Sequence, residues 1–429
     1  MAVEADSALI RDGSNRMDEE LLLENAPLSQ KLRNLTYLTF LLLGVALLWP
    51  WNSFLSATSY FQQDVFGGTS IYAKIYVSTM MSISTISSVV INLWLSRRQH
   101  SYSQRVVRGL VWEVLVFGSL CALVSLHKLL PQGVVFSILM ILVLVSAAGT
   151  AMTQNGCMAI ANLFGSEFSQ AVMMGQAVAG FLPSIALFGL SFIGEVKSQS
   201  SLGIFVFFLT TVLISIAATV AYRAGKVGAC DSSDLAPPHS YEDQNKQNTV
   251  PFAVLYSKLK YVVLAIFTAF VVTLTFPVFA ANTLVMGLPL HNSQFIPLVF
   301  TIWNLGDLYG RSISDHWVFQ STFFTPWKIF LYSVGRFLLV PIFFFFNING
   351  TSHTSNRVLS DMCYLLLQFI FGVTNGNVVS ISFMKVPTLL QTDQERKAAG
   401  GFTNIFLSTG LALGSVVSYG LVFFLESYK

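Results

Sequence analysis

Asp307 and Arg311 are oppositely charged side chains four residues apart in a stretch that is otherwise apolar enough to cross a membrane. Phe300 and Asn304 precede them, so the spacings are four, three and four and all four side chains share one face of a helix. An ionisable side chain in hydrocarbon costs at least ~2.5 kcal/mol, so these charges must face a polar interior or each other. Two readings satisfy this: a buried structural ion pair, or the lining of a polar substrate path.

The chemistry of the stripe favours the substrate path. A carboxylate such as Asp307 accepts hydrogen bonds from vicinal hydroxyls, as a sugar presents them. Arg311 donates to hydroxyl or ring oxygens and keeps Asp307 ionised, while Phe300 adds an aromatic wall and Asn304 an amide. We therefore expect substrate binding at these four residues.

The first apolar segment contains a second candidate group, Trp51 and Asn52, directly after Pro50. Proline lacks an N–H and crowds the carbonyl of Ala46, which predicts a kink, and such breaks mark transport sites. The flat face of Trp51 suits stacking on a planar ring. The alternative is an aromatic belt at the membrane interface.

Gln154 is the third candidate, on one helix face with Thr150 and Cys157. Its primary amide offers donors and acceptors and suits the edge of a heterocycle. The alternative is a buried glutamine bonded to a neighbouring helix. With Trp51 and Asp307, Gln154 describes a pocket for a planar base joined to a polyol.

The composition indicates the elements that carry these residues. Hydrophobic residues make up 54% of the chain and charged residues 10%, against roughly 25% charged residues in soluble domains, so lipid must cover most of the surface. We expect an all-α integral membrane protein with eleven spanning helices. The apolar runs predict spans at 35–60, 71–95, 106–128, 133–161, 169–193, 200–224, 259–284, 292–315, 326–348, 358–385 and 398–426.

Basic residues predict the orientation. With the N-terminus in the cytoplasm, 18 of the 24 Lys and Arg residues fall on the cytoplasmic side, five fall on the other side, and Arg336 lies within a span. The C-terminus then lies on the lumenal or extracellular side. The first apolar run follows more than thirty residues of polar tail and has no small-residue cleavage site, so we expect a retained helix and not a signal peptide.

The polar segments predict the domain organisation. Residues 1–34 form a disordered cytoplasmic tail, 35–224 a six-helix bundle, 225–258 a cytoplasmic linker and 259–429 a five-helix bundle. This six-plus-five division is the outline of a major-facilitator-like transporter in which one bundle rocks against the other.

The remaining polar residues suggest no other chemistry. The net charge of +3 is dispersed and gives no sign of nucleic-acid binding, and the four cysteines and six histidines are too scattered for a metal site. We expect no cofactor. Glu113, close enough to its helix end to reach the interface, and Arg336, paired with backbone carbonyls or an acid, are expected to be structural.

Two short motifs concern processing. Asp18 precedes Leu22 and Leu23 at the spacing of an acidic dileucine signal read by sorting adaptors, although a nascent amphipathic turn explains it equally well. Asn349-Gly350-Thr351 is a glycosylation sequon on the predicted non-cytoplasmic side.

Four separated motifs resemble the equilibrative nucleoside transporter family. Trp49–Phe54 is similar to its first-helix PWN motif, and Asn304–Arg311 to its DxxGR signature in helix eight. Residues 372–376 and 410–414 resemble its motifs in helices ten and eleven. The match spans nearly the whole chain, although the cytoplasmic loop is short for the family.

This resemblance implies a major-facilitator-like fold that moves nucleosides, and sometimes nucleobases, down their gradient. It assigns Trp51, with Asn52 beside it, and Gln154 to the base, and Asp307 and Arg311, with Asn304 one turn before, to the ribose. Met80 and Met81 are candidates for the helix-two wall. The leucine motif is similar to those of lysosomal or vacuolar members, with the plasma membrane as the alternative, and the fold is usually complete as a monomer.

Three alternatives remain at this stage. Proton-coupled transport of nucleosides or nucleobases would need a titratable carboxylate, but Arg311 should keep Asp307 ionised, so we expect weak or no proton dependence. A membrane receptor for nucleoside-like ligands would be expected to have seven spans and larger signalling loops. An intramembrane enzyme would need a nucleophile with its base or a metal motif, and the sequence has neither.

Overall fold

The computed structural model describes residues 30–192, 201–225, 227, 249–350 and 356–427. Asp18, Leu22 and Leu23, and most of the predicted linker, lie outside these residues. Within them the structure is helical.

The helices before the linker are here called the N half. They are α2 (Gln30–Ser56), α3 (Thr58–Tyr60), the π-helix η1 (Phe61–Val65), α4 (Ile71–Arg97), α5 (Tyr102–Leu126), η2 (His127–Leu129), α6 (Gln132–Phe164), α7 (Ser166–Leu190) and α8 (Ser201–Ala224).

The helices after the linker are here called the C half. They are α10 (Phe252–Thr273), α11 (Phe276–Asn282), α12 (Asn292–Ser312), η6 (Ile313–Asp315), α13 (Trp317–Gln320), α14 (Pro326–Gly335), η7 (Arg336–Leu339), η8 (Pro341–Phe345), α15 (Arg357–Thr388) and α16 (Asp393–Ser427).

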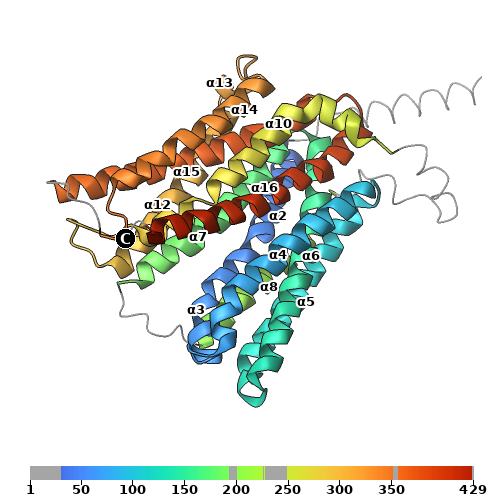
Figure 1. Cartoon of the computed structure of the whole chain (residues 1–429). Helices are drawn as coiled ribbons and strands as arrows, with labels where there is room; N and C mark the ends of the chain where they lie inside the picture. Colours follow the sequence, from blue (N-terminus) through green and yellow to red (C-terminus); the bar gives the residue numbers. More distant parts are fainter. Residues whose placement is uncertain (1–29, 193–200, 226, 228–248, 351–355, 428–429) are drawn as a thin grey trace, which may run out of the picture.

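The long helices form two groups that meet at one end of the molecule and diverge toward the other (Figure 1). The meeting end is where α8 ends and α10 begins, and we call it the linker end. The opposite end is called the far end. Helix α7, although part of the N half, packs against α12 and α15 of the C half.

Ten helical segments of the described chain are long and apolar enough to cross a membrane. The eighth predicted span, α12, is not among them, although it is 21 residues long. Helix α12 carries the stripe with Asn304, Asp307 and Arg311, and these polar side chains lower its hydropathy. The predicted all-α membrane architecture is confirmed.

Three spans differ in detail from the prediction. The predicted span 259–284 is divided into α10 and α11, and the predicted span 326–348 is a short α14 followed by the 3₁₀ turns η7 and η8. Helix α2 runs from Gln30 to Ser56, so the N–H that Pro50 lacks does not end the helix.

Glycines set the distance between the helices that carry the stripe. A Cβ built on Gly376 of α15 would lie 2.0 Å from the carbonyl oxygen of Asp307, and one on Gly310 of α12 would lie 2.1 Å from that of Val373. Real Cβ atoms do not approach so closely. Helices α12 and α15 can therefore keep this spacing only with glycine at both positions.

We predict that Gly376→Ala lowers the thermal stability of the purified protein, because the new methyl group must push α12 from α15. Overpacking of this kind costs about 1–3 kcal/mol. Melting monitored by intrinsic fluorescence in detergent measures the effect. Gly118→Ala is the matched control, since a Cβ at Gly118 meets nothing within 4 Å. Equal melting temperatures for both variants would contradict this account of the packing.

Candidate functional site

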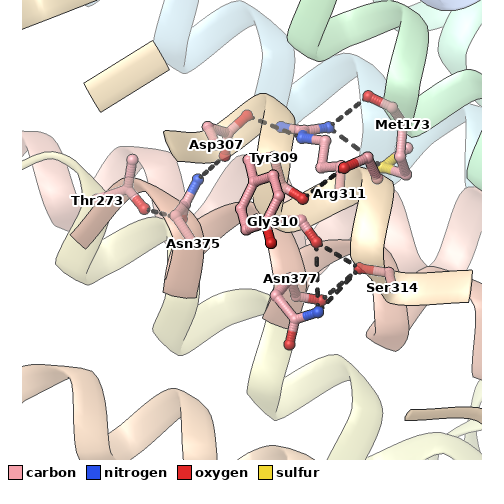
Figure 2. Close-up of polar contacts among 10 residues, drawn as sticks. Met173, Thr273, Asp307, Tyr309, Gly310, Arg311, Ser314, Asn375 and Asn377 are labelled. Carbon is pink, nitrogen blue, oxygen red and sulfur yellow. Dashed lines mark hydrogen bonds and ion pairs between the residues drawn. The ribbon is translucent and has the colours of Figure 1, made fainter. Parts of the chain in front are cut away.

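Asp307 and Arg311 form a buried ion pair on α12. Arg311 Nε donates to Asp307 Oδ2 over 2.8 Å, and the two residues are only 4% and 6% exposed (Figure 2). The pair thus faces the protein interior and not lipid. This is the arrangement that the four-residue spacing predicts.

The other carboxylate oxygen of Asp307 is held by the C half. Asn375 of α15 donates from Nδ2 to Asp307 Oδ1 over 2.6 Å. Thr273 at the end of α10 donates in turn to Asn375 Oδ1 over 2.5 Å, which fixes the orientation of that amide. Figure 2 shows this chain of contacts on one side of α12.

Arg311 reaches in the opposite direction, to the N half. Its Nη1 donates to the main-chain carbonyl of Met173 on α7 over 2.8 Å (Figure 2). Gln170, one turn earlier on α7, donates from Nε2 to the carbonyl of Arg311 over 3.4 Å. The ion pair is therefore bonded to both halves of the molecule.

The pair keeps unused hydrogen-bonding capacity. Arg311 Nη2 enters no hydrogen bond with the residues that the structure describes. Each Asp307 oxygen accepts one described hydrogen bond and has a second lone pair. A guanidinium edge beside a carboxylate can bind a diol or a ring oxygen without breaking the pair.

The rest of the stripe lies on α12 as the spacing predicts. Phe300 packs edge-on against Phe276, with 5.0 Å between ring centroids. Asn304 donates from Nδ2 to the carbonyl of Phe300 over 2.9 Å. A Cβ on Gly180 of α7 would lie 2.7 Å from Asn304 Oδ1, so this amide oxygen faces α7.

Trp51 and Asn52 lie on α2 and are both half-buried. Asn52 donates from Nδ2 to the carbonyl of Ala179 over 2.8 Å, next to the glycine that Asn304 faces. Trp51 packs against the N-half apolar cluster that contains Met80 and Leu139, and none of its described contacts is with Asp307 or Arg311.

Gln154 of α6 bonds across the two halves. Its Nε2 donates to Oδ1 of Asn404 on α16 over 3.3 Å. Thr150, predicted on the same face, points instead into the N half, where it donates to Glu113 over 2.8 Å. Cys157 is fully buried in an apolar cluster.

Glu113 and Arg336 are the two charged residues that the sequence predicted to be structural. The sequence suggested that Glu113 reaches the membrane interface, but the structure buries it. It is 1% exposed, and its carboxylate accepts hydrogen bonds from Ser146 and Thr150, both at 2.8 Å. Arg336 donates to the carbonyl of Ala269 over 3.1 Å, one of the two kinds of partner predicted for it.

Sequence reasoning missed Asn375, Thr273, Gln170 and Asn404. Asn375 lies within residues 372–376, which resemble a family motif, but nothing in the sequence of its own helix indicated that Asp307 is its partner. Each of these residues is polar and sits in a predicted span, which is the signal that could have found them.

The described part of the predicted sequon lies at the far end. Asn349 is half-buried and donates from Nδ2 to the carbonyl of Leu425 over 3.3 Å. Thr351 lies outside the described residues, and glycosylation at Asn349 stays a prediction.

Comparisons with known proteins agree on one family. A family model described as "Nucleoside transporter" matches residues 139–230 and 225–423. The chain is 49% identical to the nucleoside transporter FUN26 of Saccharomyces cerevisiae, over 94% of this chain and 87% of that protein. It is 23% identical to the human equilibrative nucleoside transporter 2, over 90% of this chain and 96% of that protein.

Solved structures agree on the fold. The Major Facilitator Superfamily transporter FucP, in the outward conformation, matches with a TM-score of 0.58 at 15% identity, over 92% of this chain and 99% of that one. A bacterial homologue of the iron transporter ferroportin matches with a TM-score of 0.57 at 13% identity, over 92% and 94%. The predicted major-facilitator-like fold is confirmed.

We predict that Asp307→Ala or Arg311→Ala destabilises the protein by about 3–5 kcal/mol, because each leaves the other charge buried and unpaired. The charge-free double variant Asp307→Ala with Arg311→Ala should melt at a higher temperature than either single variant. Thermal melting of the four purified proteins in detergent measures this coupling. Strictly additive effects would mean that the pair is not an energetic unit.

Proposed function

The chain belongs to the nucleoside transporter family, and we propose that it transports nucleosides by facilitated diffusion through alternating access. In this proposal Asp307 and Arg311 bind the ribose, helped by Asn304, while Trp51, Asn52 and Gln154 bind the base and Phe300 supplies an aromatic wall. The observation that carries it is the ion pair, which is bonded to both halves and retains free hydrogen-bonding positions.

The chemistry of the pair suits a ribose. Vicinal hydroxyls can donate to the second lone pairs of Asp307, and Arg311 Nη2 can donate to a hydroxyl or to the ring oxygen. Arg311 already neutralises Asp307 at 2.8 Å, so sugar binding requires no proton. This supports an equilibrative carrier over a proton-coupled one.

The level of the site along the helices supports alternating access. On α6, every residue from 155 to 162 is buried, whereas Gln154 and many residues before it are only partly buried. On α16, residues 398–404 are buried and 405–407 are partly exposed. Continuous burial between the halves therefore ends at Gln154 and Asn404, where we place the substrate.

Contacts on the linker side of this level join the two halves. Ser96 of α4 donates to the carbonyl of Gly401 over 2.8 Å, and Asn162 of α6 donates to the carbonyl of Arg396 over 3.1 Å. A Cβ on Gly400 would lie 2.4 Å from the amide nitrogen of Ala159. We infer that this is the closed inner gate, which must separate to release substrate at the linker end.

The orientation in the membrane, the choice of membrane and the oligomeric state are also proposals. The distribution of basic residues supports a cytoplasmic linker end and a C-terminus on the lumenal or extracellular side. The Asp18, Leu22 and Leu23 motif favours a lysosomal or vacuolar membrane over the plasma membrane, through a sorting adaptor. We propose a functional monomer embedded in lipid that accepts nucleosides and possibly nucleobases.

We predict that Asp307→Ala and Arg311→Ala each reduce uridine uptake into proteoliposomes at least about tenfold at subsaturating concentration. The reason is the loss of charge-assisted hydrogen bonds worth about 1.5–3 kcal/mol each. Arg108→Ala is the matched control, since Arg108 lies on α5 and donates to the exposed Gln104. Normal uptake by both site variants would refute the assigned roles, and no uptake by the unaltered protein would refute uridine transport.

We further predict that locking the inner gate stops transport. Asn162→Cys and Arg396→Cys, introduced together after replacement of the four native cysteines, should be joined by a short bifunctional thiol reagent that can be cleaved by reductant. Uptake should fall to background and return on cleavage, while either single variant should be unaffected by the reagent. Undiminished uptake by the joined protein would show that these segments do not separate during transport.

A further inference from the structure

Asn404 is a buried amide whose hydrogen-bonding capacity is only partly used. It lies on α16, is 1% exposed, and accepts a hydrogen bond from Gln154 at Oδ1 over 3.3 Å. Its Nδ2 group is buried and has no acceptor among the residues that the structure describes. Buried amide N–H donors without acceptors are uncommon, because leaving such a donor unpaired costs free energy. A bound molecule could therefore supply the acceptor that Asn404 Nδ2 lacks.

Gln154 complements this donor. The side chain is half-buried on α6, and it uses Nε2 to reach Asn404. Its Oε1 enters no hydrogen bond with the described residues. The two linked amides thus offer one free N–H donor from the C half and one free carbonyl acceptor from the N half.

The pair also stands where a substrate would have to pass. Gln154 and Asn404 mark the end of continuous burial between α6 and α16, and the next polar residue along α16, Ser408, donates only to carbonyls of its own helix. The bond between Gln154 and Asn404 is long, so a ligand can separate the amides with little loss.

We propose that Asn404 is a base-binding residue, which with Gln154 recognises the hydrogen-bonding edge of the nucleobase from both halves at once. The proposal rests on the nucleoside transport proposed above and adds a contact from α16 to it. Asn404 Nδ2 donates to the acceptor on the edge of the base, and Gln154 Oε1 accepts from the neighbouring donor.

This arrangement fits more than one base. Uracil and hypoxanthine carry a carbonyl beside a ring N–H, and adenine and cytosine carry a ring nitrogen beside an amino group. Each edge therefore has an acceptor next to a donor, and an amide can turn to present either order. The substrate class is any nucleoside with this edge unblocked, purine or pyrimidine.

Isosteric adenosine analogues test the contact in proteoliposomes. In adenosine the acceptor is ring nitrogen N1, which 1-deazaadenosine replaces with C–H, while 3-deazaadenosine makes the same replacement away from this edge. Against labelled adenosine uptake by the unaltered protein, 1-deazaadenosine should inhibit about tenfold more weakly than adenosine, because one hydrogen bond to a buried donor is lost. 3-Deazaadenosine should match adenosine.

Asn404→Leu removes the donor and keeps the side-chain size, so 1-deazaadenosine and adenosine should then inhibit equally. Ser408→Ala is the matched control and should keep the discrimination of the unaltered protein. Asn404→Ala replaces the leucine variant if that protein does not fold.

Persistent discrimination against 1-deazaadenosine in the Asn404 variant, or its absence in the unaltered protein, would overturn the role of Asn404 while leaving nucleoside transport standing. No adenosine uptake by the unaltered protein would instead overturn both.

Discussion

The buried pair of Asp307 and Arg311 imposes the main constraint on this fold, because hydrocarbon offers no water to satisfy a charge. Each ion must find its partners in the protein. Arg311 neutralises Asp307, Asn375 holds the second carboxylate oxygen, and a main-chain carbonyl of α7 receives Arg311. These bonds require α7, α12 and α15 to pass close together, and the glycines of α12 and α15 permit that approach.

The sequence predicted what depends on a single helix. The spacing of Asp307 and Arg311 was enough to place them on one face, since i and i+4 positions are neighbours in any α-helix. The apolar runs likewise predicted the spans, including the polar α12. The resemblance to a transporter family then indicated the fold that the solved structures confirm.

What escaped prediction depends on contacts between helices. Asn375 and Asn404 are separated from their partners Asp307 and Gln154 by 68 and 250 positions along the chain, and no local pattern encodes such pairings. The interruption between α10 and α11 was missed because the apolar run continues across it from one helix into the other. Thr150 was predicted on the same helix face as Gln154, but it donates to Glu113 on the neighbouring α5, a partner that the sequence did not indicate.

The contact of Arg311 with α7 has a consequence for how such a protein can diverge. The acceptor is the carbonyl oxygen of Met173, which every amino acid possesses. Random replacement at position 173 can change the size and flexibility of the side chain without removing the acceptor for the arginine. Met173 is fully buried in the apolar core, so packing limits which side chains fit there. Any side chain that does fit leaves the bond across the two halves in place, because that bond is inherited with the backbone.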